Sequence, residues 1–233
     1  MLGAEGHRDY LEAIRLGQRE ALMATLLEKA VRPGATVVDV GAFIGHFTLL
    51  AARATGPSGR VHAFEPDPRD YPWLLRNVEE NGFTGRVIAE AVALSDRTGT
   101  ALLHLAQQDT SQSSIVFAAD AAGSVAVPTI ALDEHLPRGS EVGLVKIDVE
   151  GAEIEALRGM EGILTGSPDV SLFIEVNPRA LEAAGFSTEV LLDRLRELGF
   201  DYLLIDEPHE TLVPFGGKVE GVNFVNLLCT KRR

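Results

Sequence analysis

A short strand pattern that ends in a glycine turn is the feature that most limits what this chain can fold into. Thr36–Val40 is an apolar, β-branched run, and His46–Ala54 has the pattern of a helix. Gly41 and Gly45 lie in the turn between them. Strand, tight turn and helix in this order form the nucleotide-binding unit of open α/β sheets. The chain is therefore expected to bind a ligand at this turn.

Apolar and amphipathic segments alternate along the rest of the chain, which predicts a doubly wound α/β fold with a mainly parallel sheet. The predicted strands are Thr36–Val40, Arg60–Phe64, Arg86–Val92, Gly143–Val149, Val170–Val176, Asp201–Ile205 and Asn223–Thr230. The predicted helices are His46–Ala54, Pro68–Asn81, Ala152–Gly159 and Thr188–Leu198. The last hairpin should supply an antiparallel strand. A length of 233 residues suits one domain, so we expect residues 1–233 to form a single domain.

Two carboxylates near the turn indicate what the ligand is. Glu65 stands about twenty residues beyond the glycine turn, where an acid accepts hydrogen bonds from ribose hydroxyls. Asp39 precedes the first glycine and would repel a pyrophosphate, and no G-x-G-x-x-G follows it. S-adenosylmethionine carries a sulfonium and an ammonium group instead, so it is favoured over NAD. In the alternative interpretation, Asp39 is a polar strand end and the glycines only make a turn.

Composition excludes several classes of partner. The chain has 34 acidic and 21 basic residues, and a net charge of −13 opposes binding to nucleic acid. Its single cysteine, Cys229, has no partner for an intramolecular disulfide. No stretch resembles a membrane-spanning helix or a signal peptide. We expect a soluble protein in the cytoplasm without a membrane partner, and the sequence favours no oligomeric state.

Two segments lie outside the alternating pattern. Residues 1–34 include a stretch with helical spacing, Tyr10–Val31, that is expected to cover the mouth of the cofactor site or the edge of the sheet. Residues 98–132 hold three short β-like pieces, Ala101–Leu105, Ser114–Ala118 and Val125–Ile130, around a polar run. Long insertions of this kind are often functional loops. This insertion is our candidate for substrate contact, and an ordinary surface loop is the alternative.

Three charged residues arrive together at the end of the predicted strand Gly143–Val149. Lys146, Asp148 and Glu150 occupy alternate positions, which point to the same side of a strand. The carboxyl ends of strands face the ligand crevice in open α/β sheets. We therefore expect these side chains to lie in the site. A self-neutralising salt-bridge cluster that caps the next helix is the alternative.

Together these motifs resemble the FkbM-type S-adenosylmethionine-dependent methyltransferases, from about residue 35 to residue 199. The matching blocks are Asp39–Gly45, Phe64–Pro66, Ala93–Asp96 and Lys146–Gly151 with Glu153 and Leu157–Gly159. The resemblance implies a class I methyltransferase fold and, commonly, O-methylation of a hydroxyl on a small molecule such as a sugar or secondary metabolite. The chain departs from the family at Phe43, where Asn is usual, which removes a polar cofactor contact.

The resemblance also implies roles for individual residues. Asp39, Gly41 and Gly45 would cradle the methionine moiety, and Glu65 would bind the ribose. The adenine would lie near Glu90, Ala91 and Val92, although Glu90 is equally consistent with a solvated strand end.

Transfer to an alcohol needs a base, because the acceptor must lose its proton as the methyl group arrives. The candidate catalytic residues are Asp148, Glu150 and Glu175. Three oxygen ligands, from Asp148, Glu175 and Asn177, would alternatively suit Mg²⁺, but we favour a site without metal. Two rival functions are a non-catalytic S-adenosylmethionine- or adenosine-binding module and a nicotinamide oxidoreductase.

Overall fold

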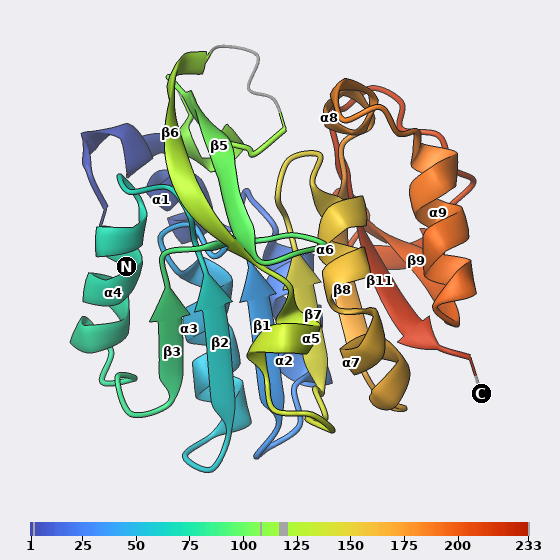
Figure 1. Ribbon diagram of the computed structural model, residues 1–233, viewed down its shortest axis with the longest axis horizontal. Coiled ribbons are helices and arrows are strands. Elements are labelled where there is room, and N and C mark those ends of the chain that lie inside the picture. The colour runs from blue at the N-terminus through green and yellow to red at the C-terminus, as the bar shows by residue number, and fades with distance from the viewer. Residues whose placement is uncertain (2, 108, 117–120, 233) are drawn as a thin grey trace.

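The computed structural model describes residues 1, 3–107, 109–116 and 121–232. An eight-stranded sheet crosses its centre in the order β10-β9-β11-β8-β7-β1-β2-β3 (Figure 1). The strands are β1 Thr36–Val40, β2 Arg60–Phe64, β3 Val87–Glu90, β7 Leu144–Ile147, β8 Ser171–Val176, β9 Phe200–Asp206, β10 Thr211–Pro214 and β11 Val225–Lys231. The neighbouring strands β3, β2, β1, β7 and β8 are parallel, whereas β11 runs antiparallel to both β8 and β9. The predicted doubly wound sheet with an antiparallel C-terminal strand is confirmed.

Helices cover both faces of this sheet, because its central strands are apolar on both sides. One face packs against α2 Ala21–Ala30, α3 His46–Thr55 and α4 Tyr71–Glu80. The other packs against α5 Leu132–His135, α6 Glu153–Gly159, α7 Glu161–Gly166, α8 Pro178–Ala183 and α9 Thr188–Glu197. Alternation within β1 divides the two cores, since Val37 joins the first cluster and Val38 the second. The same alternation decides which face carries the buried charges of the site.

A second, smaller sheet stands beyond the carboxyl ends of the central strands (Figure 1). It contains β4 Ala93–Leu94, β5 Gly99–Ala106 and β6 Ala121–Ile130 in the order β4-β6-β5. The insertion predicted at residues 98–132 forms most of it. Of the predicted piece Ser114–Ala118, Ser114 makes an isolated bridge with His104, and residues 117 and 118 lie outside the described residues.

Several elements differ from prediction. The strand predicted at Gly143–Val149 ends at Ile147, so Asp148 and Glu150 lie beyond β7 and not within it. Helices α5, α7 and α8 were not predicted. The N-terminal stretch forms two helices, α1 Arg8–Arg15 and α2, separated at Gly17 and at Glu20, both of which have positive φ. The predicted strand Arg86–Val92 ends at Glu90, and the chain then joins the small sheet. Strand β10 was not predicted. Among the described residues, no helix combines the length and apolar character needed to cross a bilayer.

Candidate active site

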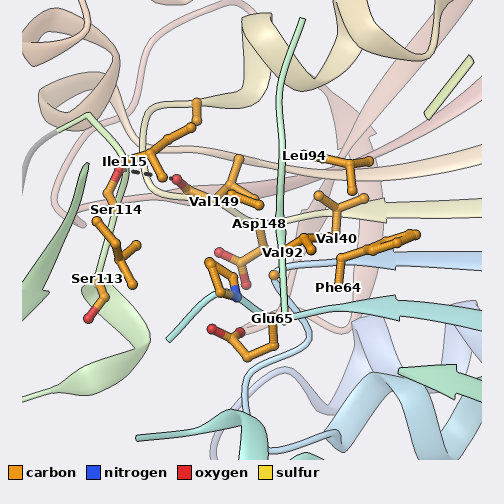
Figure 2. A pocket seen from close by; sticks show the side chains of 15 residues that line it. Val40, Phe64, Glu65, Val92, Leu94, Ser113, Ser114, Ile115, Asp148 and Val149 are labelled. Carbon is orange, nitrogen blue, oxygen red and sulfur yellow. Dashed lines mark hydrogen bonds between the residues drawn. The ribbon is translucent and has the colours of Figure 1, made fainter. Parts of the chain in front are cut away.

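Two cavities open where the glycine turn, the end of β7 and the insertion meet. The first, which we call the glycine-loop cavity, is lined by residues of all three segments, among them Gly41, Asp148 and Ser114. Figure 2 shows Ser114 and Ile115 of the insertion across from Val40 and Phe64, with Glu65 and Asp148 between them. The cavity is thus mainly apolar, with two carboxylates in its wall.

Glu65 follows β2 and is held in place by the backbone around it. Its two carboxylate oxygens accept hydrogen bonds from the N–H groups of Phe43 (2.7 Å) and Asp67 (2.7 Å). Burial raises the pKa of Glu65 to about 8, although the two N–H donors act in the opposite direction. A carboxylate oxygen has two lone pairs, so each one still has room for a ligand hydroxyl.

The two glycines of the turn are required by packing as much as by a ligand. Gly41 lines the glycine-loop cavity and has φ +76°, and a Cβ there would stand 1.8 Å from the Asp148 carbonyl oxygen. Gly45 has φ +97°, and its Cβ would meet Leu74 Cδ1 at 2.9 Å. The first glycine therefore lets the turn touch the end of β7, and the second lets α3 begin against α4.

Phe43 occupies a left-handed backbone conformation in this turn, with φ +52°. Its ring makes edge contacts with the rings of His7 (centroids 5.2 Å apart) and Tyr10 (5.0 Å). Asparagine adopts this conformation more readily than phenylalanine. The aromatic side chain instead anchors the N-terminal segment over the turn.

Asp39 lies on the α3 face of β1, is 1% exposed and lines neither cavity. Its carboxylate accepts a 2.5 Å hydrogen bond from Thr48 Oγ1 and stands 3.8 Å from Lys146 Nζ. Lys146 in turn donates to the Gly41 carbonyl oxygen (2.9 Å) and pairs with Asp148 (3.2 Å). Asp39 thus reaches the site through Lys146, which ties the glycine turn to the end of β7.

The second cavity, which we call the acidic cavity, lies beside the first and shares Asp148 with it. Asp148, Glu150 and Glu175 each offer one oxygen to a group whose members all lie within 4.8 Å of one another. Burial, with Asp148 and Glu153 nearby, raises the pKa of Glu150 to about 8. Burial, with Asp148 and Glu150 nearby, also raises the pKa of Glu175 well above its usual value. The structure therefore brings together the three residues predicted as catalytic.

Local geometry explains how Glu150 and Asn177 are oriented. Glu150 lies beyond the end of β7 with φ +51°, and Ser114 Oγ of the insertion donates a 2.7 Å hydrogen bond to its carbonyl oxygen. The Asn177 amide donates to the Glu150 carboxylate (2.8 Å), while its oxygen accepts from the Ala180 N–H and caps α8. The third oxygen beside Asp148 and Glu175 therefore comes from Glu150, and not from Asn177.

Of the three residues predicted near the adenine, only Val92 lines the glycine-loop cavity. Glu90 ends β3 and its carboxylate lies 2.8 Å from His135 Nε2, outside the residues that line the glycine-loop cavity. Ala91 is exposed and also lies outside that lining, whereas Val92 belongs to it. An adenine near this strand end would contact Val92 first.

Sequence reasoning missed three residues that the N-terminal segment contributes to the acidic cavity: Tyr10, Arg19 and Glu20. Glu20 is 9% exposed, and burial followed by the charge of Asp148 raises its pKa to about 6. The Arg19 guanidinium carbon lies 5.0 Å from the centre of the Tyr10 ring. A charged residue between two helices carries no signal of such burial, because the contact depends on how α1 and α2 fold back over the sheet.

Comparison with known proteins identifies the family. The profile of the Methyltransferase FkbM domain matches residues 39–202, which span the glycine turn, Glu65 and all three clustered carboxylates. The chain belongs to the FkbM methyltransferase family. This FkbM domain is 32% identical to the 31-O-demethyl-FK506 methyltransferase FkbM of Streptomyces tacrolimicus, over 56% of the chain and 61% of that protein. It is also 32% identical to the hexuronic acid methyltransferase AglP of Haloferax volcanii, over 65% of the chain and 63% of that protein.

The chain thus spans about three fifths of the length of these curated relatives. Solved structures agree with the FkbM domain in fold. A TehB-like SAM-dependent methyltransferase from Corynebacterium glutamicum aligns with a TM-score of 0.53 at 14% identity, over 97% of this chain and 95% of that one. An rRNA methylase from Streptococcus thermophilus aligns with a TM-score of 0.54 at 12% identity, over 91% and 95%. The FkbM domain therefore has the class I methyltransferase fold.

Proposed function

We propose that this protein is an S-adenosylmethionine-dependent methyltransferase that acts on a hydroxyl oxygen of a small molecule. The observation that carries the proposal is the meeting of the two cavities at Asp148. One cavity is apolar with a ribose-binding acid, and the other is lined by carboxylates suited to take up a proton. A donor in the first cavity and an acceptor in the second would come together at this residue.

The residues of the glycine-loop cavity fit the adenosine part of the methyl donor. Val92, Leu94 and Leu103 offer aliphatic surface for a base, and Glu65 keeps free lone pairs for two ribose hydroxyls. The charge of the methyl donor also fits this site, because the carboxylates of Asp148 and the acidic cavity favour a neighbouring sulfonium and ammonium group. We assign Gly41 and Glu65 to cofactor binding on this basis.

When bound, S-adenosylmethionine supplies a methyl group that moves from sulfur to the acceptor oxygen, while the electron pair of the broken C–S bond stays on sulfur. The residues of this chain must align the acceptor and remove the hydroxyl proton. We assign Asp148 to accept that proton, because it borders both cavities. Glu150 and Glu175 lie within reach of the same acceptor and complete the wall of the acidic cavity.

The names of the relatives and the charge of this chain support a small-molecule acceptor. The two relatives described above are named for FK506 and for a hexuronic acid, and a net charge of −13 opposes a polyanionic substrate. The fold alone leaves an RNA acceptor open, since an rRNA methylase shares it. An acceptor screen with labelled methyl donor should therefore include RNA, and labelling of RNA in place of small hydroxyl compounds would refute the acceptor class.

Cofactor binding and turnover test the proposal separately. Calorimetry should detect binding of S-adenosylhomocysteine but not of NADH. With an acceptor in hand, Asp148→Asn should lower the methyl-transfer rate by about 10²–10⁴-fold while the cofactor affinity stays near that of the wild type. Binding of NADH alone would favour an oxidoreductase. Binding of S-adenosylhomocysteine without turnover of any acceptor would favour a non-catalytic binding module.

A further inference from the structure

The acidic cavity contains more acidic than basic side chains. Four of its lining residues are carboxylates, Glu20, Asp148, Glu150 and Glu175, and two are cations, Arg19 and Lys146. When all six of these groups are ionised, the four carboxylates and two cations leave the cavity with a net charge of −2. Charges at buried sites must be paired, because an unpaired one loses its hydration without compensation.

Neither cation of the cavity forms an ion pair with Glu150 or Glu175. Lys146 Nζ is shared among the Gly41 carbonyl oxygen (2.9 Å), Asp148 (3.2 Å) and Asp39 (3.8 Å). Arg19 lies over the Tyr10 ring, and its nearest ion-pair partner is Glu20 at 3.6 Å. Among the described residues, Glu150 and Glu175 form no ion pair.

Glu175 gives the second and more specific indication. Its side chain is 4% exposed and lines the cavity, and its Oε1 atom has no hydrogen-bond partner among the described residues. A buried acceptor without a partner is costly, at about 1–3 kcal/mol and more for a charged group. A bound ligand that coordinates this oxygen would remove that cost.

We propose that Asp148, Glu150 and Glu175 bind one divalent cation of the Mg²⁺ or Mn²⁺ type. Their oxygens come within 4.8 Å of one another, as ligands around a single ion must. Carboxylate oxygens are the ligands that such hard cations prefer, and three of them leave open positions for water or substrate oxygens. The +2 charge of such a cation also balances the net charge of −2 that the ionised cavity carries.

The cation gives the acceptor site a chemical role that carboxylates alone lack. A carboxylate is a weak base for an alcohol, and a metal ion lowers the pKa of an oxygen that it binds. An acceptor hydroxyl coordinated beside Asp148 would give up its proton more readily. This role rests on the proposed methyl transfer, whereas binding of the cation does not.

Titration of the full chain with Mn²⁺ alone tests the site. Free Mn²⁺ is followed by electron paramagnetic resonance at pH 7.5, and calorimetry with Mg²⁺ repeats the measurement. We expect one site, with a dissociation constant below about 1 mM, the weak end for oxygen-ligand sites. Glu175→Gln should weaken Mn²⁺ binding by about 10–100-fold or more. Loss of a residue that only supports a metal ligand already has an effect of this size.

Glu20→Gln is the matched control, because Glu20 is a buried glutamate of the same cavity that lies outside the three-carboxylate group. It should weaken Mn²⁺ binding far less than Glu175→Gln does. If circular dichroism shows that Glu175→Gln does not fold, Glu150→Gln carries the same expectation.

Three outcomes would overturn the proposal. They are the absence of Mn²⁺ binding to the wild type, unchanged binding in the folded Glu175 or Glu150 variant, and an equal loss in Glu20→Gln, which would indicate diffuse attraction. Since the titration uses neither methyl donor nor acceptor, its failure leaves the proposed methyl transfer standing. Conversely, a protein that binds Mn²⁺ but not S-adenosylhomocysteine would refute only the proposed function.

Discussion

Replacing Gly41 with alanine should disturb the protein where the glycine turn touches the end of β7. Gly41 has φ +76°, and this conformation costs a residue with a Cβ about 1–2 kcal/mol. The new methyl group would also lie 1.8 Å from the Asp148 carbonyl oxygen, whereas real Cβ contacts stay above 3.0 Å, so that carbonyl must retreat by about 1 Å. Overpacking of this kind costs about 1–3 kcal/mol more. We expect a total loss of about 2–5 kcal/mol in the free energy of unfolding.

Gly82→Ala provides the matched control. Gly82 has φ +72°, but a Cβ there would meet nothing within 4 Å, so only the backbone cost of about 1–2 kcal/mol applies. Urea denaturation of both variants separates the two terms. Calorimetry with S-adenosylhomocysteine should also show weaker binding in Gly41→Ala alone, because the displaced Asp148 borders both cavities. Equal losses of stability in the two variants, with unchanged binding, would refute the argument.

Three further predictions concern buried carboxylates. Glu65→Gln should weaken binding of S-adenosylhomocysteine by about 1–3 kcal/mol in calorimetry, because an amide donor replaces one of the two oxygens that accept hydrogen bonds. Unchanged affinity would remove Glu65 from the cofactor site. The pKa of Glu65 is raised to about 8 by burial, so the folded state holds its proton more tightly than the unfolded state does. The contribution of Glu65 to the free energy of unfolding is therefore complete below about pH 4.5 and falls by up to about 1.4 kcal/mol per pH unit as the pH rises towards 8. Thermal melts of the free protein should follow this trend. The same pH dependence of the melting temperature in Glu65→Gln would contradict it. Thr48→Val leaves the buried Asp39 carboxylate without its 2.5 Å donor and should cost about 1–3 kcal/mol of unfolding free energy by urea titration, whereas wild-type stability would mean that Lys146 alone satisfies Asp39.

Local patterns predicted the parts of the site that lie on the central strands. The bounds of β1 and β2 match the prediction residue for residue, because each is a compact apolar run set off by glycine or polar turns. The carboxylates at 148, 150 and 175 followed from their positions at strand ends, which is a property of the chain order. Strand β10 was missed because Thr211–Pro214 is short and half-exposed at the edge of the sheet.

Contacts between distant segments were not predictable in the same way. Tyr10 and Glu20 enter the acidic cavity only because the N-terminal helices return over the glycine turn. The orientation of the Asn177 amide depends on whether its oxygen caps α8, which a sequence pattern does not specify. Asp39 shows the limit of a charge argument, since its partner Lys146 comes from a strand more than a hundred residues away.

Asp148 lines both cavities, so one inhibitor could be designed to bind in the two cavities at once. On the proposed function, a single compound with an adenosine group at one end and an acceptor-like polar group at the other would bind across Asp148. Once one end has bound, the other experiences an effective concentration set by the length of the connecting chain. A short connector that matches the span would therefore give such a bivalent compound far higher affinity than either half alone, and would also discriminate between relatives whose second cavities differ.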